Sequence, residues 1–312
     1  MLSKKFDNYM VLANHFLDQN QYHQALDAYE KSLAFAPDEE ERKEVLLEIA
    51  DIHLYLHQYE EAQGVFETLK AQDEKMPEVY YGLAIINDFT KGPLERSKDY
   101  YKKAIELDPS YDRAHYYLGH VLWDLGDEKL AEEEFKTCTQ LDPNDPITYN
   151  DLGALYESWG QLDKAKENIE KSLVLDPNYW RALFNMGVVL KGMGEHKEAL
   201  SFYRKSLEEK PMPDTFLNMS AIYIEDQNFL QALEILQEGL GYFPNAVNLR
   251  YNTACTFVHL NKDDDGWLEL EKAIAENPNV IDWAYKDPDL TDLMLRYHKG
   301  GNDGNHKDAT RN

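Results

Sequence analysis

The sequence predicts an all-α protein, a superhelical solenoid of about eight helix-turn-helix repeats. Three observations predict it. Prolines recur at a nearly constant interval, the same order of small and large apolar residues surrounds each of them, and helix-favouring Leu, Ala, Glu and Lys are abundant. Glycines and prolines fall mostly at regular intervals, which indicates repeats and argues against a mixed α/β enzyme.

The prolines set the register of the repeats. They stand at 109, 143, 177, 211, 244 and 278, at intervals of 34, 34, 34, 33 and 34 residues. Such a period is typical of two antiparallel helices joined by a turn. Because the residue before a proline is disfavoured in the α region, each of these prolines predicts the end of a second helix. Pro77, Pro146 and Pro213 suit the first position of a helix, where no N–H is needed.

Small residues recur where the two helices of a pair must approach closely. On the first helix they are Ala13, Ala50, Ala84, Gly119, Gly153, Gly187, Ser220 and Ala254. On the second helix they are Ala25, Ala62, Ser97, Ala131, Ala165, Ala199, Ala232 and Gly266. The large residues predicted to fill the seams are Tyr29, Phe66, Tyr101, Phe135, Ile169, Tyr203, Leu236 and Leu270. This pattern places repeats at about 6–39, 43–76, 77–111, 112–145, 146–179, 180–212, 213–246 and 247–280.

The segments YDRAHYYLGHVLWDLGDEKLAEEEFKTCTQLDPN (111–144) and ITYNDLGALYESWGQLDKAKENIEKSLVLDPN (147–178) resemble the tetratricopeptide repeat. An aromatic residue, Leu-Gly, a second aromatic, Ala, a third aromatic, a small residue and Pro recur in a fixed order. The resemblance covers roughly residues 6–280, and the chain is similar to all-repeat bacterial tetratricopeptide proteins. It implies a right-handed α-α superhelix whose first helices line a concave groove that binds other polypeptides.

The end of the chain departs from the repeat pattern. A repeat stack needs its terminal apolar face covered, and residues 281–298 are predicted to supply a capping helix. Its apolar residues are Ile281, Trp283, Leu290, Leu293, Leu295 and Tyr297. Residues 299–312 have almost nothing to bury and are expected to form a disordered tail.

The charge of the chain limits its partners. With 32 basic and 58 acidic residues the net charge is −26, which repels phosphate backbones and anionic lipid surfaces. No window approaches the roughly 18 to 20 apolar residues of a membrane helix, and the N-terminus does not resemble a signal peptide. Cys138 and Cys255 match no paired pattern, which fits a reducing cytoplasm. We therefore expect a cytoplasmic protein that binds neither nucleic acid nor membrane.

Three features imitate catalytic or metal-binding patterns, and each is incomplete. His53 and His57 are four residues apart, but no Glu follows His53. Residues 261–272 imitate a calcium loop, but Lys272 stands where a bidentate Glu is needed, so an N-cap cluster of aspartates explains the segment. Cys255 lacks an orienting base and an oxyanion site, so a packing role is expected. We expect no catalytic residue, no metal site and no cofactor.

The candidate binding surface is the wall formed by the first helices. Aromatic residues gather in its middle: Tyr81, Phe89, Tyr116, Trp123 and Phe184. They are either anchors for apolar side chains of a ligand or packing residues against the next repeat. Arg113, Arg181 and Lys191 are the few cations on this wall, and either a ligand carboxylate or the neighbouring Asp and Glu residues could be their partners.

Asparagines recur at one position of the repeats more regularly than the aromatic residues do. Asn185, Asn218 and Asn252 occupy one equivalent position in successive repeats, and Asp151 holds that position one repeat earlier. Asn150 occupies a different position of its repeat that is also predicted to face the groove. This row resembles the asparagine ladder in the tetratricopeptide superhelix of O-linked N-acetylglucosamine transferase, which implies that the amides hold the main chain of a ligand. An amide offers both a donor and an acceptor, so it can pair with any peptide unit. The alternative is that each Asn bonds to its own helix backbone.

The sequence therefore predicts a non-catalytic scaffold or adaptor that binds an extended or helical segment of a protein or peptide in its groove. An acidic surface favours partners with basic residues, and the aromatic row favours apolar ones. A peptide-sensing regulator and a substrate-recruiting subunit of an enzyme complex are the alternative functions. The oligomeric state does not follow from the sequence.

Overall fold

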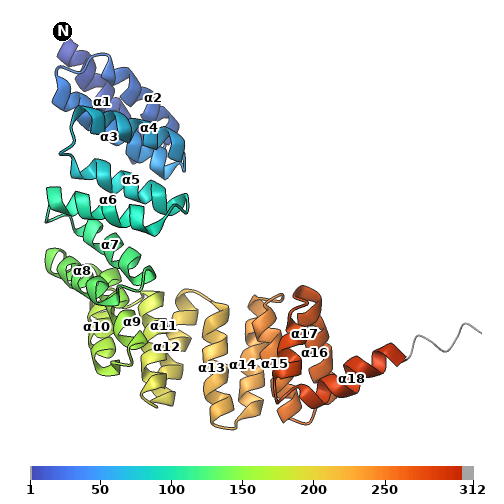
Figure 1. Cartoon of the computed structure of the whole chain (residues 1–312). Coiled ribbons are helices and arrows are strands. Elements are labelled where there is room, and N and C mark those ends of the chain that lie inside the picture. The colour runs from blue at the N-terminus through green and yellow to red at the C-terminus, as the bar shows by residue number, and fades with distance from the viewer. Residues whose placement is uncertain (1, 304–312) are drawn as a thin grey trace, which may run out of the picture. The chain divides into compact units, whose positions relative to one another are not determined.

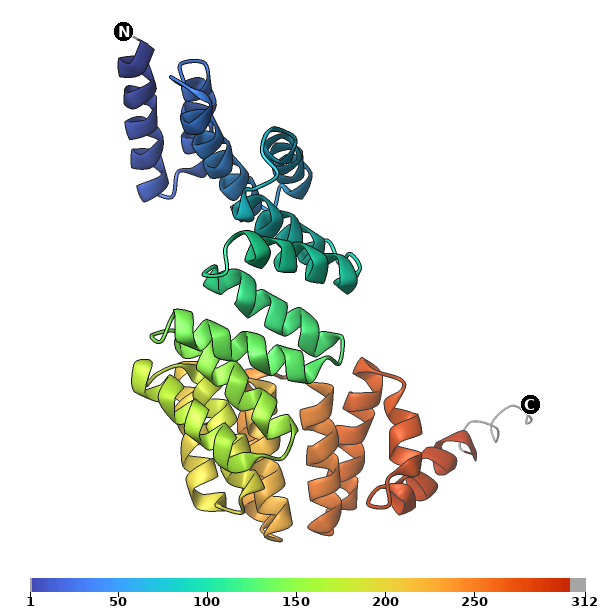
Figure 2. The same cartoon turned by 60° about the vertical axis from the view of Figure 1, so that its left-hand side comes forward.

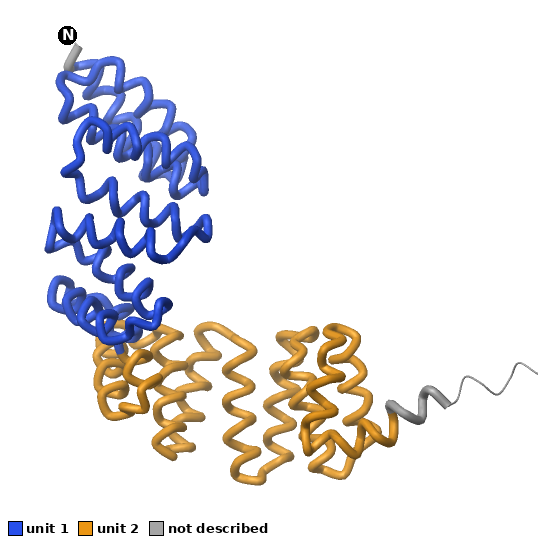
Figure 3. The backbone as a smooth tube through the Cα atoms, viewed as in Figure 1, with its two compact units in different colours: residues 1–152 blue, residues 153–312 orange. Residues whose placement is uncertain are grey.

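The computed structural model describes residues 2–303, which form eighteen helices and no strand (Figure 1). The chain forms two compact units, unit 1 (Met1–Leu152) and unit 2 (Gly153–Asn312), coloured blue and orange in Figure 3. Helix α9 (Pro146–Ser158) contains the boundary between them. Unit 1 begins with α1 (Leu2–Asp18), α2 (Tyr22–Leu33), α3 (Glu39–Tyr55), α4 (Tyr59–Gln72), α5 (Pro77–Phe89), α6 (Leu94–Leu107), α7 (Asp112–Asp124) and α8 (Glu128–Leu141). Unit 2 continues with α10 (Leu162–Leu175), α11 (Trp180–Gly192), α12 (His196–Glu209), α13 (Pro213–Glu225), α14 (Phe229–Tyr242), α15 (Val247–His259), α16 (Asp263–Glu276), α17 (Val280–Lys286) and α18 (Thr291–Asp303).

The first sixteen helices form eight consecutive pairs, which confirms the predicted all-α repeat fold. The two helices of each pair are 12 to 17 residues long, and most have 13 or 14. Two repeats begin earlier than predicted, at Leu2 and Glu39. In the second case the acidic residues that follow Asp38 form the first turn of α3, because the Asp38 carboxylate accepts hydrogen bonds from the N–H groups of Glu40 and Glu41.

Each pair turns through one residue in the left-handed region, with φ between 56° and 83°. The next N–H then reaches back five residues to the first helix: Asp127 donates to the Leu122 carbonyl at 2.8 Å and Glu195 to that of Leu190 at 2.9 Å. Gly occupies this position in three central repeats, where a side chain would be strained. The eight residues are Asn20, His57, Lys91, Gly126, Gly160, Gly194, Gln227 and Asn261.

The second helices end as the prolines predict. The residues before Pro109, Pro143 and Pro177 are extended, with φ/ψ of −134°/95°, −121°/90° and −134°/94°. Pro77, Pro146 and Pro213 begin α5, α9 and α13, also as predicted. The chain therefore leaves each second helix abruptly and enters the next first helix without a long loop.

The predicted small positions are where paired helices touch. A Cβ atom on Gly187 would lie 2.5 Å from Cε1 of Tyr203, far inside van der Waals contact. All eight predicted seam residues are buried, and so are the alanines and serines that face them: Ala13, Ala25, Ala50, Ala62, Ala84, Ser97, Ala131, Ala165, Ala199, Ser220, Ala232 and Ala254. Close approach of the helices thus follows from missing side-chain volume at fixed positions.

We call the side of each unit that is formed by the first helices of its pairs the first-helix face. In unit 1, α3 packs directly on α5; in unit 2, α11 packs on α13 and α13 on α15. The second helices pack between neighbouring first helices, as α14 does between α13 and α15. Figures 1 and 2 both show α13 to α16 standing side by side.

Two helices, and not one, cover the end of the last repeat. Val280 and Ala284 of α17 and Leu293 and Met294 of α18 are fully buried with Leu290 against Ala254, Leu270 and Ala273. Trp283 and Leu295, expected in this core, are 42% and 45% exposed because they lie on the outer sides of these helices. Helix α18 continues to Asp303, into the segment expected to be disordered from residue 299, and residues 304–312 lie outside the described part of the chain.

None of the helices in the described residues combines the length and the apolar content needed to cross a bilayer.

Candidate functional site

On the first-helix face of unit 1, tyrosines form a packed cluster. The Tyr81 ring lies 5.1 Å from Tyr111 and 6.0 Å from Tyr117, and Tyr117 stacks on Tyr101 at 6.0 Å. Burial and the neighbouring tyrosines raise the pKa of Tyr81 above its ordinary value. Tyr81 therefore packs against the next repeat, while Tyr117 stays exposed at the surface of the cluster.

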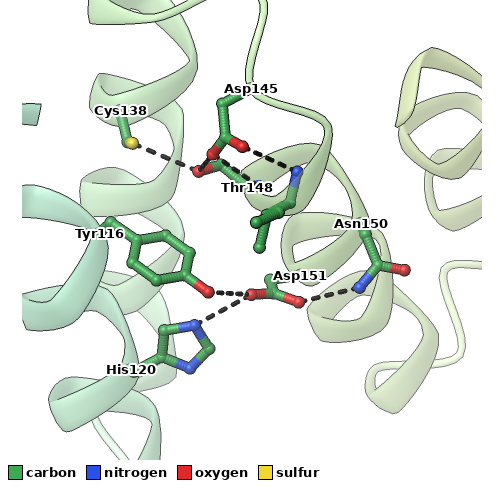
Figure 4. Close-up of polar contacts among 8 residues, drawn as sticks. Tyr116, His120, Cys138, Asp145, Thr148, Asn150 and Asp151 are labelled. Atoms are coloured by element: carbon green, nitrogen blue, oxygen red, sulfur yellow. Dashed lines mark hydrogen bonds and ion pairs between the residues drawn. The ribbon is translucent and has the colours of Figure 1, made fainter. Parts of the chain in front are cut away.

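Asp151 organises the contacts between α7 and α9 (Figure 4). Its carboxylate accepts hydrogen bonds from the Tyr116 hydroxyl at 2.8 Å and the Asn150 amide at 2.9 Å, and it lies 3.0 Å from His120 Nε2. Cys138 and Asp145 hold Thr148 nearby, with Thr148 Oγ1 3.3 Å from the Cys138 sulfur. Burial raises the pKa of the Cys138 thiol to about 11, so this cysteine is a packing residue.

Asn150 does not line the first-helix face. It is only 2% exposed, and its amide bonds to its neighbour Asp151. The repeat pattern predicted that Asn150 occupies a groove-facing position, and this prediction is wrong because its side chain lies toward the core. Asn150 therefore helps to position Asp151.

The remaining predicted aromatics differ in exposure. The Trp123 ring is half-buried against Phe135 and His120, and the Phe184 ring is half-buried 5.7 Å from Tyr203. Phe89, at the end of α5, is 61% exposed and stacks on Tyr59 with ring centres 5.6 Å apart. One face of the Phe89 ring is therefore covered by protein and the other faces solvent.

Two hollows adjoin Tyr116 and Tyr117. The first, of about 630 Å³, lies between α5 and α7 and the turn after α5, and we call it the aromatic hollow. The second, of about 520 Å³, lies toward the start of α7 and contains Arg113. The residues lining the aromatic hollow are Ile85, Asp88, Phe89, Lys91, Gly92, Leu94, Tyr116, Tyr117, His120, Val121 and Asp124.

Arg113 is exposed, and among the described residues it makes no ion pair or hydrogen bond. Its charge nevertheless acts on Asp51 of α3. The pKa of Asp51 is raised to about 6, mainly because the surrounding protein removes water from the carboxylate, and also because Glu48 and Glu78 repel its negative charge. The positive charge of Arg113 lowers this pKa and so opposes the shift. Arg113 thus stands in a field of carboxylates without being held by any one of them.

In unit 2 the asparagine row lies on α11, α13 and α15. The Asn218 amide donates to the Asp214 carbonyl at 3.0 Å, and the Asn252 amide donates to the Asn248 carbonyl at 2.9 Å. This is the bonding to the residue's own helix that the sequence left open as the alternative, and it gives the two side chains the same orientation one repeat apart. Asn185, half-buried, holds the equivalent position on α11. The amides of Asn218 and Asn252 each have two N–H donors and one acceptor oxygen, so the local bond uses one donor only.

The cations of unit 2 have local contacts. Lys191 forms an ion pair with Glu225 at 2.9 Å, the alternative that the sequence left open. Arg181 is exposed, and its guanidinium lies 5.2 Å from the centre of the Trp180 ring.

The Tyr203 hydroxyl of α12 is fully buried and has no hydrogen-bond partner among the described residues. Burial, with Glu157 and Glu225 nearby, raises the pKa of Tyr203.

The features that imitate catalytic or metal sites have structural roles. Cys255 is buried behind Asp287 of the connection between α17 and α18, and burial raises the pKa of its thiol. Asp263 pairs with Arg296 at 2.5 Å, and Asp264 accepts from the Tyr297 hydroxyl, so these aspartates hold α18 and do not cap α16 by hydrogen bonds. In the described part of the chain, no group of three or more His, Cys, Asp or Glu side chains could hold a metal ion.

Paired helices, small contact positions and a repeated left-handed turn define a helical-repeat protein. Models described as "Tetratricopeptide repeat" or "TPR repeat" match residues 16–86, 89–126, 112–145, 134–167 and 181–211. The chain belongs to the tetratricopeptide repeat family. Proteins of this family bind protein or peptide partners.

Solved structures agree on the fold. A chain of the APC/C hetero-tetramer Cut9–Hcn1 is 18% identical with a TM-score of 0.61, covering 88% of this chain and 52% of that one, so this chain spans about half its length. A tetratricopeptide protein from Cytophaga hutchinsonii is 16% identical with a TM-score of 0.60, covering 80% and 99%. PilF from Pseudomonas aeruginosa is 20% identical with a TM-score of 0.55, covering 72% and 99%. A comparison with curated proteins finds no match.

Proposed function

We propose that the protein is a non-catalytic interaction scaffold whose first-helix face binds an extended or helical segment of a partner that carries basic and apolar residues. The observation that supports it most is the repeated amide orientation at Asn218 and Asn252. Because one N–H of each amide is fixed to its own helix, the amide plane is held in place. The carbonyl oxygen and the second N–H remain for a ligand's peptide units.

Main-chain recognition explains why one residue type recurs at one position. Every peptide unit offers an N–H and a C=O, so a row of amides can hold a segment whatever its side chains are. Specificity then comes from the surrounding surface. The net charge of −26 favours basic partners and excludes nucleic acid and anionic membranes from the proposal. Arg113 and Arg181, which lack ion pairs among the described residues, could receive isolated carboxylates of the same partner.

The proposal keeps the cytoplasm as the compartment. Cys138 and Cys255 are both free thiols, as suits a reducing environment. No step of the proposed function uses a cofactor or a metal.

The first experiment identifies peptides and tests the asparagine row with them. Peptides selected from a random library on the full chain are titrated against the wild type and the triple variant Asn185→Ala, Asn218→Ala, Asn252→Ala. Loss of two or three hydrogen bonds should weaken binding by at least about tenfold. N-methylation of the peptide backbone, which removes one N–H at a time, should weaken binding at some positions even where the side chain is unimportant.

The chain offers a matched control. Asn178, Asn245 and Asn279 are exposed, follow the prolines that end three second helices, and recur at one equivalent position. Their triple substitution by Ala should leave peptide affinity unchanged. Equal affinities of the two triple variants, with no effect of N-methylation, would remove the asparagine row from the proposal.

A further inference from the structure

The aromatic hollow of unit 1 has walls of two kinds. Apolar and aromatic side chains form its sides, with Phe89 and Leu94 on one side and Tyr117 and Val121 on the other. Carboxylates stand with them, Asp88 from α5 and Asp124 from α7. Since α3 and α5 pack directly while α5 and α7 leave this space between them, the hollow is a local feature of one repeat junction.

The aromatic rings are held in place by the protein. Phe89 lies on Tyr59 with an angle of 15° between the ring planes, and its other face is open. Tyr117 is fixed by stacking on Tyr101 and by the edge of Tyr116, whose hydroxyl is bound to Asp151. Rigid aromatic faces of this kind attract a cation without having to reorganise.

The two carboxylates that line the hollow differ in their hydrogen bonds. Asp88 already accepts hydrogen bonds from the Tyr101 hydroxyl, at 2.7 Å, and from the Ser97 hydroxyl. Asp124 is exposed and makes no ion pair or side-chain hydrogen bond with the described residues. Lys91 is the cation among the lining residues, and it also has no ion pair in the described part of the chain. Two carboxylates and one ammonium group therefore line the hollow, and of these only Asp88 is held by hydrogen bonds from the described residues.

We propose that the aromatic hollow binds an arginine side chain of the partner, with the guanidinium on the open face of Phe89 and its N–H groups directed to Asp124. The planar guanidinium stacks on aromatic rings and is more weakly hydrated than an ammonium, which suits a hollow whose sides are mostly apolar. Lys91 swings aside toward solvent when the site is filled. This inference rests on the proposed function, because it names the side-chain chemistry of the bound segment.

The test uses small probes, since the partner is unidentified. N-acetyl-L-arginine amide is titrated into the full chain carrying ¹³C-labelled phenylalanine rings, and N-acetyl-L-citrulline amide, of the same shape without the charge, is titrated in parallel. Phe89→Leu identifies the Phe89 signal. The arginine probe should shift this signal and saturate at low millimolar concentration, as expected for so few atoms. The citrulline probe should bind at least about fivefold more weakly.

Two substitutions and a control test whether Asp124 and Phe89 contact the guanidinium of the arginine probe. Asp124→Asn should weaken the arginine probe about three- to tenfold, and Phe89→Leu, followed through the remaining labelled rings, about two- to fivefold. Asp99→Asn, an exposed carboxylate on α6 that does not line the hollow, should leave affinity unchanged. Circular dichroism and thermal unfolding of the three variants establish that each is folded before it is titrated.

Equal binding of arginine and citrulline probes would overturn the proposal, and so would equal effects of Asp124→Asn and Asp99→Asn. The outcome is separable from the test of the asparagine row, which lies in unit 2 and depends on a peptide main chain. Arginine binding with an inactive asparagine row would retain the hollow and remove main-chain recognition. Peptide binding that depends on the asparagine row, without arginine binding, would retain main-chain recognition and remove the arginine site in the hollow.

Discussion

Tyr29, Tyr101 and Tyr203 occupy the same seam position in three repeats but differ in what meets their hydroxyl. The hydroxyl of Tyr29 donates to Asn14 at 2.5 Å, and that of Tyr101 donates to Asp88 at 2.7 Å. In the repeat of Tyr203, the positions of Asn14 and Asp88 hold Val188 and Lys191, and Lys191 is paired with Glu225. The Tyr203 hydroxyl is therefore left without a partner by the choice of two residues on the facing helix.

Removing these hydroxyls should have opposite consequences. Tyr101→Phe should lower the free energy of unfolding by about 1–3 kcal/mol, because it breaks a bond to a carboxylate. Tyr203→Phe should leave it unchanged or raise it by up to about 1 kcal/mol, because a buried unsatisfied hydroxyl costs free energy. Urea denaturation measures both. A loss for Tyr203→Phe as large as that for Tyr101→Phe would show that solvent satisfies the hydroxyl.

Asp51 should make stability depend on pH. Its pKa of about 6 in the folded protein exceeds the ordinary value of an unfolded Asp, about 3.9, so the folded state favours the protonated form. This contribution to stability is fully present below about pH 4 and is lost as pH rises to about 6. Asp51→Asn should therefore stabilise the protein at pH 7 but not at pH 4. Because the Asp51 side chain is exposed, screening by solvent should limit the gain to about 1 kcal/mol or less.

Thermal unfolding at pH 4 and pH 7 measures the difference, with Asp99→Asn as the control. That carboxylate is exposed on α6 and should alter stability little at either pH. If Asp51→Asn had the same effect at both pH values, the carboxyl would titrate normally in the folded protein.

Among the elements, the turns between paired helices vary in conformational cost. Gln227 has φ of 56°, in a region that costs most side chains about 1–2 kcal/mol, whereas Gly194 adopts φ of 79° at the equivalent position without strain. The same hydrogen bonds close both turns: Asn228 N–H donates to the Tyr223 carbonyl, and Glu195 N–H donates to that of Leu190. The repeat register thus imposes one conformation on eight different residues.

Gln227→Gly should raise the free energy of unfolding by about 0.5–1 kcal/mol, since relief of strain exceeds the extra freedom of glycine in the unfolded chain. Gly194→Ala should lower it by about 1 kcal/mol, and no neighbouring atom would meet the new methyl group. Chemical denaturation measures both variants. Destabilisation by Gln227→Gly would mean that the Gln227 side chain makes a contact that outweighs the strain.

What could be predicted from sequence is what depends on volume and backbone geometry. Few backbone arrangements accommodate small residues such as Gly187 and Ala199 at these positions, or a proline after Asp176. The helix pairs and the ends of the second helices could therefore be predicted from the sequence. The hydrogen-bond partners of individual side chains were harder to predict from the sequence. Asn150, predicted to face the groove, is buried and bonded to Asp151, and which of the two alternatives holds for Asn218 depends on a choice of rotamer. The aromatic hollow arises from the spacing of two helices, which no single residue encodes.

The whole molecule is a sequence of neighbouring contacts, so damage at the end of a stack should spread from one pair to the next. Leu293 of α18 is fully buried against Leu270 and Ala273 of the last repeat, whereas Leu295 on the same helix is 45% exposed. Leu293→Ala should cost about 2–5 kcal/mol and Leu295→Ala at most about 0.5 kcal/mol.

Hydrogen exchange can locate that loss. Since α15 and α16 rely on α17 and α18 to cover Ala254 and Leu270, Leu293→Ala should reduce amide protection in α15 to α18 most strongly. Helices α11 and α12, which belong to the same unit but contact the cap only through intervening pairs, should lose much less. Uniform loss across α11 to α18 would mean that unit 2 unfolds as one cooperative block, and the free energies at the interfaces between repeats would then have to exceed those within each helix pair.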